Sequence, residues 1–229
     1  MEKTIRLASL EDGFLFDAFH VAPPEARRGG LILIQEIFGV TDHIRDLARR
    51  FAADGYEVIA PALFDRCERG FVSGYDADGV AKGRRYSEET LWSKVEGDLK
   101  ACVEALAPPV FAVGFCWGGT AAWLAAARMP GLAAVSSFYG RRIPELIDEA
   151  PGCPILLHFG KSDASIPPET VALIRERHPD LSVHEYEAGH GFYSDRRSDH
   201  VADAARLSHL RTLQLFHRNA GGKVGEAEA

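Results

Sequence analysis

Short apolar runs alternate with longer amphipathic stretches along most of the chain. Residues 31–35 (LILIQ) form a continuous apolar run, as expected of a strand buried on both faces. A helix capped by Thr41 is predicted to follow and to end near residue 53, because apolar side chains recur there at helical spacing. The same alternation predicts strands at 57–60, 110–114, 132–138, 155–159 and 182–186, and helices at 87–106, 118–128, 168–177 and about 199–217. Residues 62–86 are expected to be a loop.

Strands that alternate with helices of ten or more residues indicate βαβ units and a mostly parallel sheet. We therefore expect an α/β fold with helices on both faces of a central sheet. The length of 229 residues suits one domain, assigned to residues 1–220, and residues 221–229 are expected to be a disordered tail. Sites in such sheets form where strands end. The loops to search therefore follow Gln35, Gly114, Phe159 and Tyr186.

Composition excludes several classes of function. A formal net charge of −7 and a pI near 5.7 argue against a nucleic-acid surface. No apolar run approaches the roughly 18 residues of a membrane span, and no signal peptide is recognisable, so a cytoplasmic protein with reduced cysteines is expected. No residues have metal-ligand spacing. The expected protein uses no cofactor, acts on a small molecule, and is a monomer or a small homo-oligomer.

The most informative motif follows the predicted strand at 110–114. Gly114-Phe115-Cys116-Trp117-Gly118-Gly119 has the form of a nucleophile elbow, a tight strand-to-helix turn that raises one side chain above the sheet edge. Here that side chain is a thiol, and the helix N-terminus behind it favours a thiolate. Taken alone, the motif also fits a small buried thiol in a glycine-rich turn.

A base and an orienting acid follow at two further strand ends. Asp163 lies in a polar turn after residues 155–160, and His190 lies between glycines after residues 182–187. Each residue alone is commonplace, a turn carboxylate and a loop histidine. Together with Cys116 they stand in the chain order nucleophile, Asp, His, which is the order in α/β-hydrolases. The order and placement predict a Cys116–His190–Asp163 catalytic triad.

These residues, with Gln35-Glu36-Ile37-Phe38-Gly39 and Gly160-Lys161-Ser162-Asp163, make the sequence resemble the dienelactone hydrolase family (carboxymethylenebutenolidases) over almost its whole length. The resemblance implies an α/β-hydrolase fold and a role for Glu36 in controlling the protonation of Cys116. By analogy the resting thiol is neutral, and substrate binding moves Glu36 so that it takes the proton. The backbone N–H groups of Ile37 and Trp117 would form the oxyanion hole.

The implied reaction is hydrolysis of a dienelactone to maleylacetate through a thioester on Cys116. Such substrates carry a carboxylate, which the family binds with arginines. The candidate substrate-binding residues are Arg84, Arg85, Tyr86, Arg196 and Arg197. The segment 191–197 (GFYSDRR) replaces the family's small serine-bearing segment, so this departure concerns which lactone is bound and not the type of reaction.

Three alternatives remain open from the sequence. The same residues would serve a broader carboxylesterase or thioesterase. A glyoxalase or deglycase also pairs a glutamate with a reactive thiol, but would leave Asp163 and His190 without a role. A non-catalytic binding protein would need none of the four residues Glu36, Cys116, Asp163 and His190.

Overall fold

The computed structural model describes residues 1–221, so the predicted disordered tail lies, apart from Gly221, outside the described residues. Eight strands form one sheet in the order β1-β2-β4-β3-β5-β6-β7-β8. The strands are β1 (Glu2–Ala8), β2 (Leu15–Val21), β3 (Gly29–Ile34), β4 (Tyr56–Pro61), β5 (Val110–Phe115), β6 (Leu132–Phe138), β7 (Ile155–Gly160) and β8 (Ser182–Tyr186). The helices are α1 (Asp42–Ala53), α2 (Ala77–Glu89), α3 (Trp92–Glu104), α4 (Trp117–Arg128), α5 (Pro168–Arg177) and α6 (Ala202–Asn219), with a 3₁₀ turn at Ile143–Leu146.

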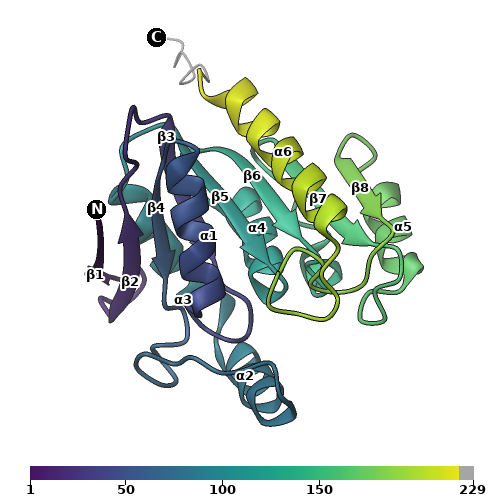
Figure 1. Cartoon of the computed structure of the whole chain (residues 1–229), viewed down its shortest axis with the longest axis horizontal. Helices are drawn as coiled ribbons and strands as arrows, with labels where there is room; N and C mark the ends of the chain where they lie inside the picture. The colour runs from purple at the N-terminus through teal and green to yellow at the C-terminus, as the bar shows by residue number, and fades with distance from the viewer. Residues whose placement is uncertain (222–229) are drawn as a thin grey trace.

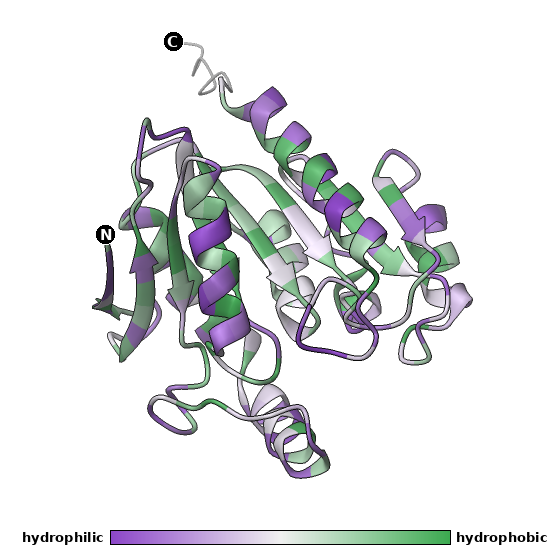
Figure 2. Ribbon diagram, viewed as in Figure 1, coloured by the Kyte–Doolittle hydropathy of each residue, from purple (hydrophilic) through white to green (hydrophobic). Residues whose placement is uncertain are grey.

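Helices cover both faces of the sheet, as the sequence predicts. Helices α1 and α6 lie on one face, and α3 and α4 lie on the other (Figure 1). Every neighbouring pair from β4 to β8 is parallel. The central strands β3 and β5 are buried along their whole length, which explains their unbroken apolar sequences. Figure 2 shows these strands as mainly hydrophobic, with hydrophilic residues gathered on the outer helices.

The two antiparallel strands β1 and β2 at one edge of the sheet have no counterpart in the sequence prediction. They pair in register from Glu2 with Val21 to Ala8 with Leu15. Five of the seven residues of β1 are exposed. An edge strand that faces solvent has no buried apolar run, so the pattern that identified the inner strands is missing.

The segment between β4 and β5 also differs from the prediction. Residues 77–89, expected to belong mainly to a loop, form helix α2, and the single helix expected at 87–106 begins only at Trp92. Asp76 caps α2 by accepting a hydrogen bond from Gly79 N at 2.8 Å. A side chain at Gly83 would place its Cβ 2.2 Å from the Ile37 carbonyl oxygen. Close packing against the loop after β3 therefore requires a glycine that weakens the helical signal.

The lengths and hydropathy of the helices bear on the expectation that the chain contains no membrane span. Across residues 1–221, no helix combines the length and the hydropathy that crossing a bilayer demands.

Candidate active site

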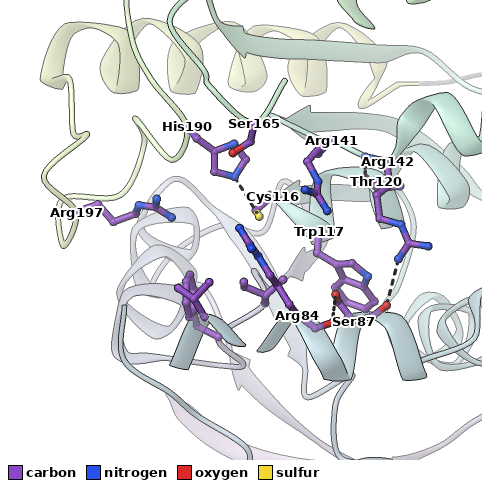
Figure 3. A pocket seen from close by; sticks show the side chains of 13 residues that line it. Arg84, Ser87, Cys116, Trp117, Thr120, Arg141, Arg142, Ser165, His190 and Arg197 are labelled. Atoms are coloured by element: carbon purple, nitrogen blue, oxygen red, sulfur yellow. Dashed lines mark hydrogen bonds between the residues drawn. The ribbon is translucent and has the colours of Figure 1, made fainter. Parts of the chain in front are cut away.

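Four sequence-predicted residues lie where strands of the sheet end. Glu36 follows β3, Cys116 follows β5, Asp163 follows β7 and His190 follows β8. Cys116 and His190 open into a cavity of about 170 Å³. That volume is below the roughly 300–1,000 Å³ of sites for drug-sized ligands, so the cavity suits a small molecule. Its lining comprises Ile37, Phe38, Val80, Arg84, Ser87, Cys116, Trp117, Thr120, Arg141, Arg142, Ser165, His190 and Arg197 (Figure 3).

The turn at Cys116 has the geometry of a nucleophile elbow. The Cys116 backbone has φ 57° and ψ −117°, a conformation that non-glycine residues rarely adopt. Its N–H donates to the Phe138 carbonyl at 3.0 Å, and its carbonyl accepts from Gly119 N at 2.9 Å. A Cβ at Gly114 would lie 1.9 Å from the Gly118 carbonyl oxygen, so β5 and α4 approach too closely for any side chain there.

A continuous hydrogen-bonded chain joins Cys116, His190 and Asp163. His190 Nε2 lies 3.2 Å from Cys116 Sγ, and His190 Nδ1 lies 2.7 Å from Asp163 Oδ2. The second carboxylate oxygen, Asp163 Oδ1, accepts from Ser165 N at 2.8 Å. The Asp163 side chain is fully buried, and that of His190 is 15% exposed. The carboxylate is therefore fixed in position and holds the imidazole with its other nitrogen toward the sulfur.

The surroundings of His190 favour its protonated form. Burial alone would lower the pKa of His190, but the neighbouring Cys116 sulfur and the hydrogen bonds to Asp163 and Cys116 outweigh it and raise the pKa to about 10.

Glu36 is a buried carboxyl group without partners. The residue is 1% exposed, and neither side-chain oxygen has a hydrogen-bond partner within residues 1–221. Burial raises the pKa of Glu36, while the nearby positive charges of Arg197 and His190 act in the opposite direction. Its hydrophobic surroundings therefore favour the neutral acid.

The two backbone groups predicted to form an oxyanion hole are free to donate. In the described part of the chain, neither Ile37 N nor Trp117 N donates to a backbone or side-chain acceptor. Trp117 is the first residue of α4, where backbone N–H groups have no partner within the helix. Both residues line the cavity beside Cys116.

Two of the five predicted substrate-binding residues line the cavity. Arg84 extends from α2, and Arg197 extends from the loop after His190 (Figure 3). The Arg197 guanidinium lies 5.8 Å from the Tyr75 ring centroid and 3.4 Å from Asp199. Between residues 1 and 221, Arg84 forms no salt bridge.

The other three, Arg85, Tyr86 and Arg196, do not line the cavity. Arg85 follows Arg84 on α2 and points elsewhere, because consecutive helical residues face different directions, and its Nε lies 3.6 Å from Glu89.

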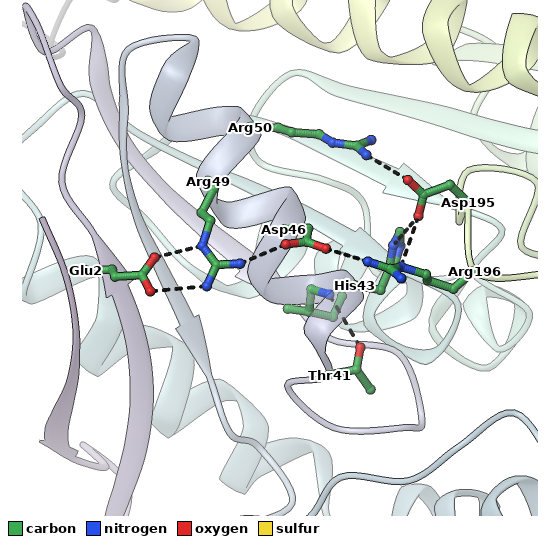
Figure 4. A network of polar contacts seen from close by, with 9 residues as sticks. Glu2, Thr41, His43, Asp46, Arg49, Arg50, Asp195 and Arg196 are labelled. Atoms are coloured by element: carbon green, nitrogen blue, oxygen red, sulfur yellow. Dashed lines mark hydrogen bonds and ion pairs between the residues drawn. The ribbon is translucent and has the colours of Figure 1, made fainter.

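Tyr86 is buried with its hydroxyl donating to Glu68 at 2.6 Å. Arg196 pairs with Asp46 of α1 at 2.9 Å, within a network that also joins Asp195 to Arg50 (Figure 4). This network ties the loop after His190 to α1.

Sequence reasoning missed Arg141 and Arg142, which also line the cavity. They follow β6, whose carboxyl end lies beside that of β5. The loop after this predicted strand was not among those searched, although the rule that places sites at strand ends applies to it equally. Arg142 is bound by Glu145 at 2.7 Å and also contacts the ring of Trp92.

Residues 1–221 contain no cluster of three His, Cys, Asp or Glu side chains suited to a metal ion. The cavity itself presents a thiol beside an imidazole, four arginines and the backbone donors of Ile37 and Trp117.

Comparisons with known proteins agree with this architecture. A Synechocystis protein provisionally named carboxymethylenebutenolidase is 34% identical over 208 residues, covering 81% of this chain and 84% of its own. A Pseudomonas putida protein named carboxymethylenebutenolidase is 31% identical over 222 residues, covering 90% and 92%. A Klebsiella pneumoniae crystal structure, provisionally named dienelactone hydrolase, superposes with a TM-score of 0.82 at 28% identity over 95% of this chain and 99% of its own.

The sequence model of the dienelactone hydrolase family matches residues 16–220, which is most of the chain. With the α/β-hydrolase architecture and the relatives above, this match establishes the protein as a hydrolase of ester-type bonds that belongs to the dienelactone hydrolase family.

Proposed function

We propose that this protein is a cysteine hydrolase that opens an anionic enol-lactone, converting dienelactone to maleylacetate through a thioester on Cys116. The observation that carries the proposal is the chain from Asp163 through His190 to the Cys116 sulfur, at 2.7 and 3.2 Å, which ends in a small cavity lined by arginines. A thiol, a base and an orienting acid at these distances are what nucleophilic catalysis requires.

In the first step, the Cys116 thiolate attacks the lactone carbonyl carbon while His190 holds the thiol proton. The N–H groups of Ile37 and Trp117 donate hydrogen bonds to the carbonyl oxygen as negative charge develops on it. The ring C–O bond then breaks, the carbonyl remains bound to sulfur as a thioester, and the His190 proton passes to the departing enolate oxygen. The resulting enol tautomerises to the ketone of maleylacetate.

In the second step, His190 takes a proton from water, and the resulting hydroxide attacks the thioester carbonyl. The C–S bond breaks and the thiolate is restored. Asp163 stabilises the imidazolium in both steps and fixes the tautomer of the neutral ring.

Glu36 has a separate part in the proposal. His190 contacts the sulfur directly, whereas within residues 1–221 Glu36 hydrogen-bonds to no side chain. We assign the first proton transfer to His190 and give Glu36 the role of a neutral, buried acid in the resting enzyme. The family resemblance instead assigns that transfer to Glu36, and the two assignments differ in which variant, His190→Asn or Glu36→Gln, makes Cys116 less reactive.

Arg84 and Arg197 are the proposed partners of the substrate carboxylate, because both line the cavity beside Cys116. Arg85 and Arg196, which face away from the cavity, serve as matched controls. Arg84→Ala and Arg197→Ala should raise KM for dienelactone more than for a neutral ester, and Arg85→Ala and Arg196→Ala should not.

The decisive experiment is a kinetic panel of cis- and trans-dienelactone, neutral p-nitrophenyl esters and an acyl thioester, with Cys116→Ala beside the parent protein. A preference for dienelactone that Cys116→Ala abolishes is expected. Mass spectrometry of a His190→Asn variant mixed with substrate should detect the acyl group on Cys116. Undiminished turnover by Cys116→Ala would overturn the thiol mechanism, and a preference for neutral esters or thioesters would identify a broader esterase or thioesterase.

A further inference from the structure

A second hydrogen-bonded chain made of a carboxylate, an imidazole and a hydroxyl lies apart from Cys116. The Tyr193 hydroxyl lies 2.7 Å from His209 Nδ1, and His209 Nε2 lies 2.9 Å from Asp54 Oδ2. Tyr193 belongs to the loop after β8, His209 belongs to α6, and Asp54 caps the C-terminal end of α1. This chain of side chains therefore joins three segments that are far apart in the sequence.

The direction of these hydrogen bonds follows from the burial of Tyr193. Burial raises the pKa of Tyr193, so its hydroxyl keeps the proton and donates to His209 Nδ1. In the neutral ring the other nitrogen then carries the hydrogen and donates it to the Asp54 carboxylate. Both ring nitrogens of His209 are thus paired, and the hydroxyl of Tyr193 has one fixed acceptor.

Tyr193 is attached to both members of the Cys116–His190 pair. It follows His190 by three positions on the same loop. Its ring packs against Phe115 and Phe138, with centroid separations of 4.9 and 5.0 Å. Phe115 directly precedes Cys116, and the Phe138 carbonyl accepts from the Cys116 N–H at 3.0 Å. A displacement of Tyr193 would therefore move His190 relative to the elbow.

The loop after β8 is also attached to α1 by ion pairs at the surface. Arg50 and Asp195 lie 2.7 Å apart, with side chains that are 55% and 38% exposed (Figure 4). Exposed pairs of this kind stabilise little, because water and salt screen them and ordering long side chains costs entropy. Tyr193 is only 5% exposed, and an unpaired hydroxyl at that depth is costly. The buried chain therefore holds the loop more firmly than the surface pairs do.

We propose that Tyr193 is a positioning residue whose hydroxyl is anchored by His209 and Asp54, and whose ring keeps His190 Nε2 close to the Cys116 sulfur. The proposal rests on the proposed function only in taking Cys116 and His190 as the reactive pair. Neither Tyr193 nor His209 lines the active-site cavity, so the 3.2 Å contact is held from outside it.

A small displacement is enough to change the rate of reaction. A shift of about 1 Å caused by a residue remote from the reacting atoms can lower a rate about 100-fold. Loss of one hydrogen bond lowers the population of the arrangement that it stabilises by about five-fold. We therefore expect removal of the Tyr193 hydroxyl to have an effect of about five-fold or more on the Cys116–His190 pair.

Alkylation of Cys116 by iodoacetamide, followed by mass spectrometry over a range of pH, measures this contact without requiring turnover. The variants are Tyr193→Phe, His209→Leu and the double variant. His209→Asn is the conservative variant, because its amide oxygen can take the place of Nδ1 as the acceptor for Tyr193. The Tm of each variant and its kcat and KM for phenyl acetate are measured alongside.

Tyr193→Phe should slow alkylation near neutral pH by about five-fold and lower kcat by a similar factor, with KM unchanged. The difference in alkylation should shrink at high pH, where a thiol ionises without help from an imidazole. His209→Leu should have the same effect and His209→Asn a smaller one. The double variant should lose no more than the larger single loss, because the hydroxyl and the ring act as one unit.

Thr212→Val is the matched control. Thr212 is buried on α6, and its hydroxyl lies 2.8 Å from that of Ser136. Within residues 1–221 its hydrogen-bond partners are Ser136, His158 and Ser208, and none of them belongs to the loop after β8. Thr212→Val should lower the Tm and leave the alkylation rate and kcat unchanged.

Three results would overturn the proposal. The first is alkylation of Cys116 at the parental rate in Tyr193→Phe, whatever its Tm. The second is a double variant in which the losses of Tyr193→Phe and His209→Leu multiply. The third is a loss in Thr212→Val as large as that in Tyr193→Phe.

Failure of the proposed function is recognised separately. Full turnover by Cys116→Ala would contradict the thiol mechanism. The alkylation rates would still decide whether Tyr193 sets the contact between Cys116 and His190, because they need no substrate.

Discussion

The Nε2 atom of His190 lies 3.2 Å from the Sγ atom of Cys116, although 74 positions of the chain separate them. Cys116 follows β5 and His190 follows β8, so the loop after β8 reaches across the ends of β7 and β6 to make this contact. The contact joins the protonation of the thiol to that of the ring.

Replacing His190 should make Cys116 less reactive near neutral pH. The pKa of His190 is raised to about 10, so its imidazolium persists at pH 7 and places a positive charge 3.2 Å from the Cys116 sulfur. We expect His190→Asn to slow alkylation of Cys116 by iodoacetamide about ten-fold or more at pH 7, and Glu36→Gln to slow it less. Cys153 is an internal reference, because burial raises its pKa to about 11. Equal alkylation rates in the parent protein and His190→Asn would show that the contact does not activate the thiol.

Removing the charge of Asp163 should disable the site while preserving its shape. Asp163→Asn keeps the side-chain volume but offers His190 a neutral partner, which favours the wrong tautomer of the ring. We expect kcat to fall about 10³- to 10⁴-fold, as it does when the acid of a Ser-His-Asp triad becomes its amide. Ester hydrolysis and circular dichroism measure the two effects. The exposed Asp180→Asn is the control. A decrease in kcat of less than ten-fold for Asp163→Asn would contradict the place of Asp163 in the catalytic triad.

Glu36 should make the protein less stable as the pH rises. Because the pKa of Glu36 is raised in the folded state, the folded protein retains a proton above pH 4.5 that the unfolded chain has released. Stability is therefore full below pH 4.5 and is lost as the pH rises toward the folded pKa.

Glu36→Gln should remove this loss, so its Tm should exceed that of the parent protein by an amount that grows from pH 4.5 to pH 8. For a chain of this size the shift is about 2–4 °C for each kcal/mol. Differential scanning calorimetry measures it, with the exposed Glu176→Gln as a control. A Tm difference that does not change with pH would mean that Glu36 is ionised throughout.

The elbow should tolerate no side chain at Gly114. A methyl group there would meet the Gly118 carbonyl oxygen at 1.9 Å, so β5 and α4 would have to separate. We expect Gly114→Ala to lower the free energy of unfolding by about 3 kcal/mol or more, at the upper end of overpacking effects. Urea denaturation measures this change. At Gly152 the nearest atom to an added Cβ is 3.5 Å away, so Gly152→Ala should cost much less, and equal losses would contradict the steric explanation.

The inner part of the fold could be predicted because burial on both faces leaves a continuous apolar signature. The predicted strands at 132–138 and 182–186 and the helix at 168–177 match the structure at both ends. Strand β1 and helix α2 could not be found in this way. The exposed strand β1 has no apolar run, and α2 contains glycines that serve its packing.

The residues of the candidate site also fall into two groups, those that the sequence could identify and those that it could not. Cys116, Asp163 and His190 stand in short motifs, and the structure brings them into one hydrogen-bonded chain, while their catalytic roles stay predictions. The cavity-lining arginines depend on the direction in which each side chain points. Arg84 and Arg85 are adjacent in sequence, yet only Arg84 lines the cavity, because the unpredicted helix α2 turns them in different directions.

Helix α2 has a consequence for how this enzyme could change over time. It packs at the strand ends, apart from the parallel core, and brings Arg84 to a cavity whose thiol, histidine and aspartate stand on loops between core strands and helices (Figure 1). Arg141 stands on another short connection, after β6. The residues proposed to carry out the reaction and the cavity-lining arginines Arg84 and Arg141 thus lie in separate segments of the chain. Substitutions within residues 77–89 and 140–142 can give descendants new substrates while the hydrolytic machinery stays intact.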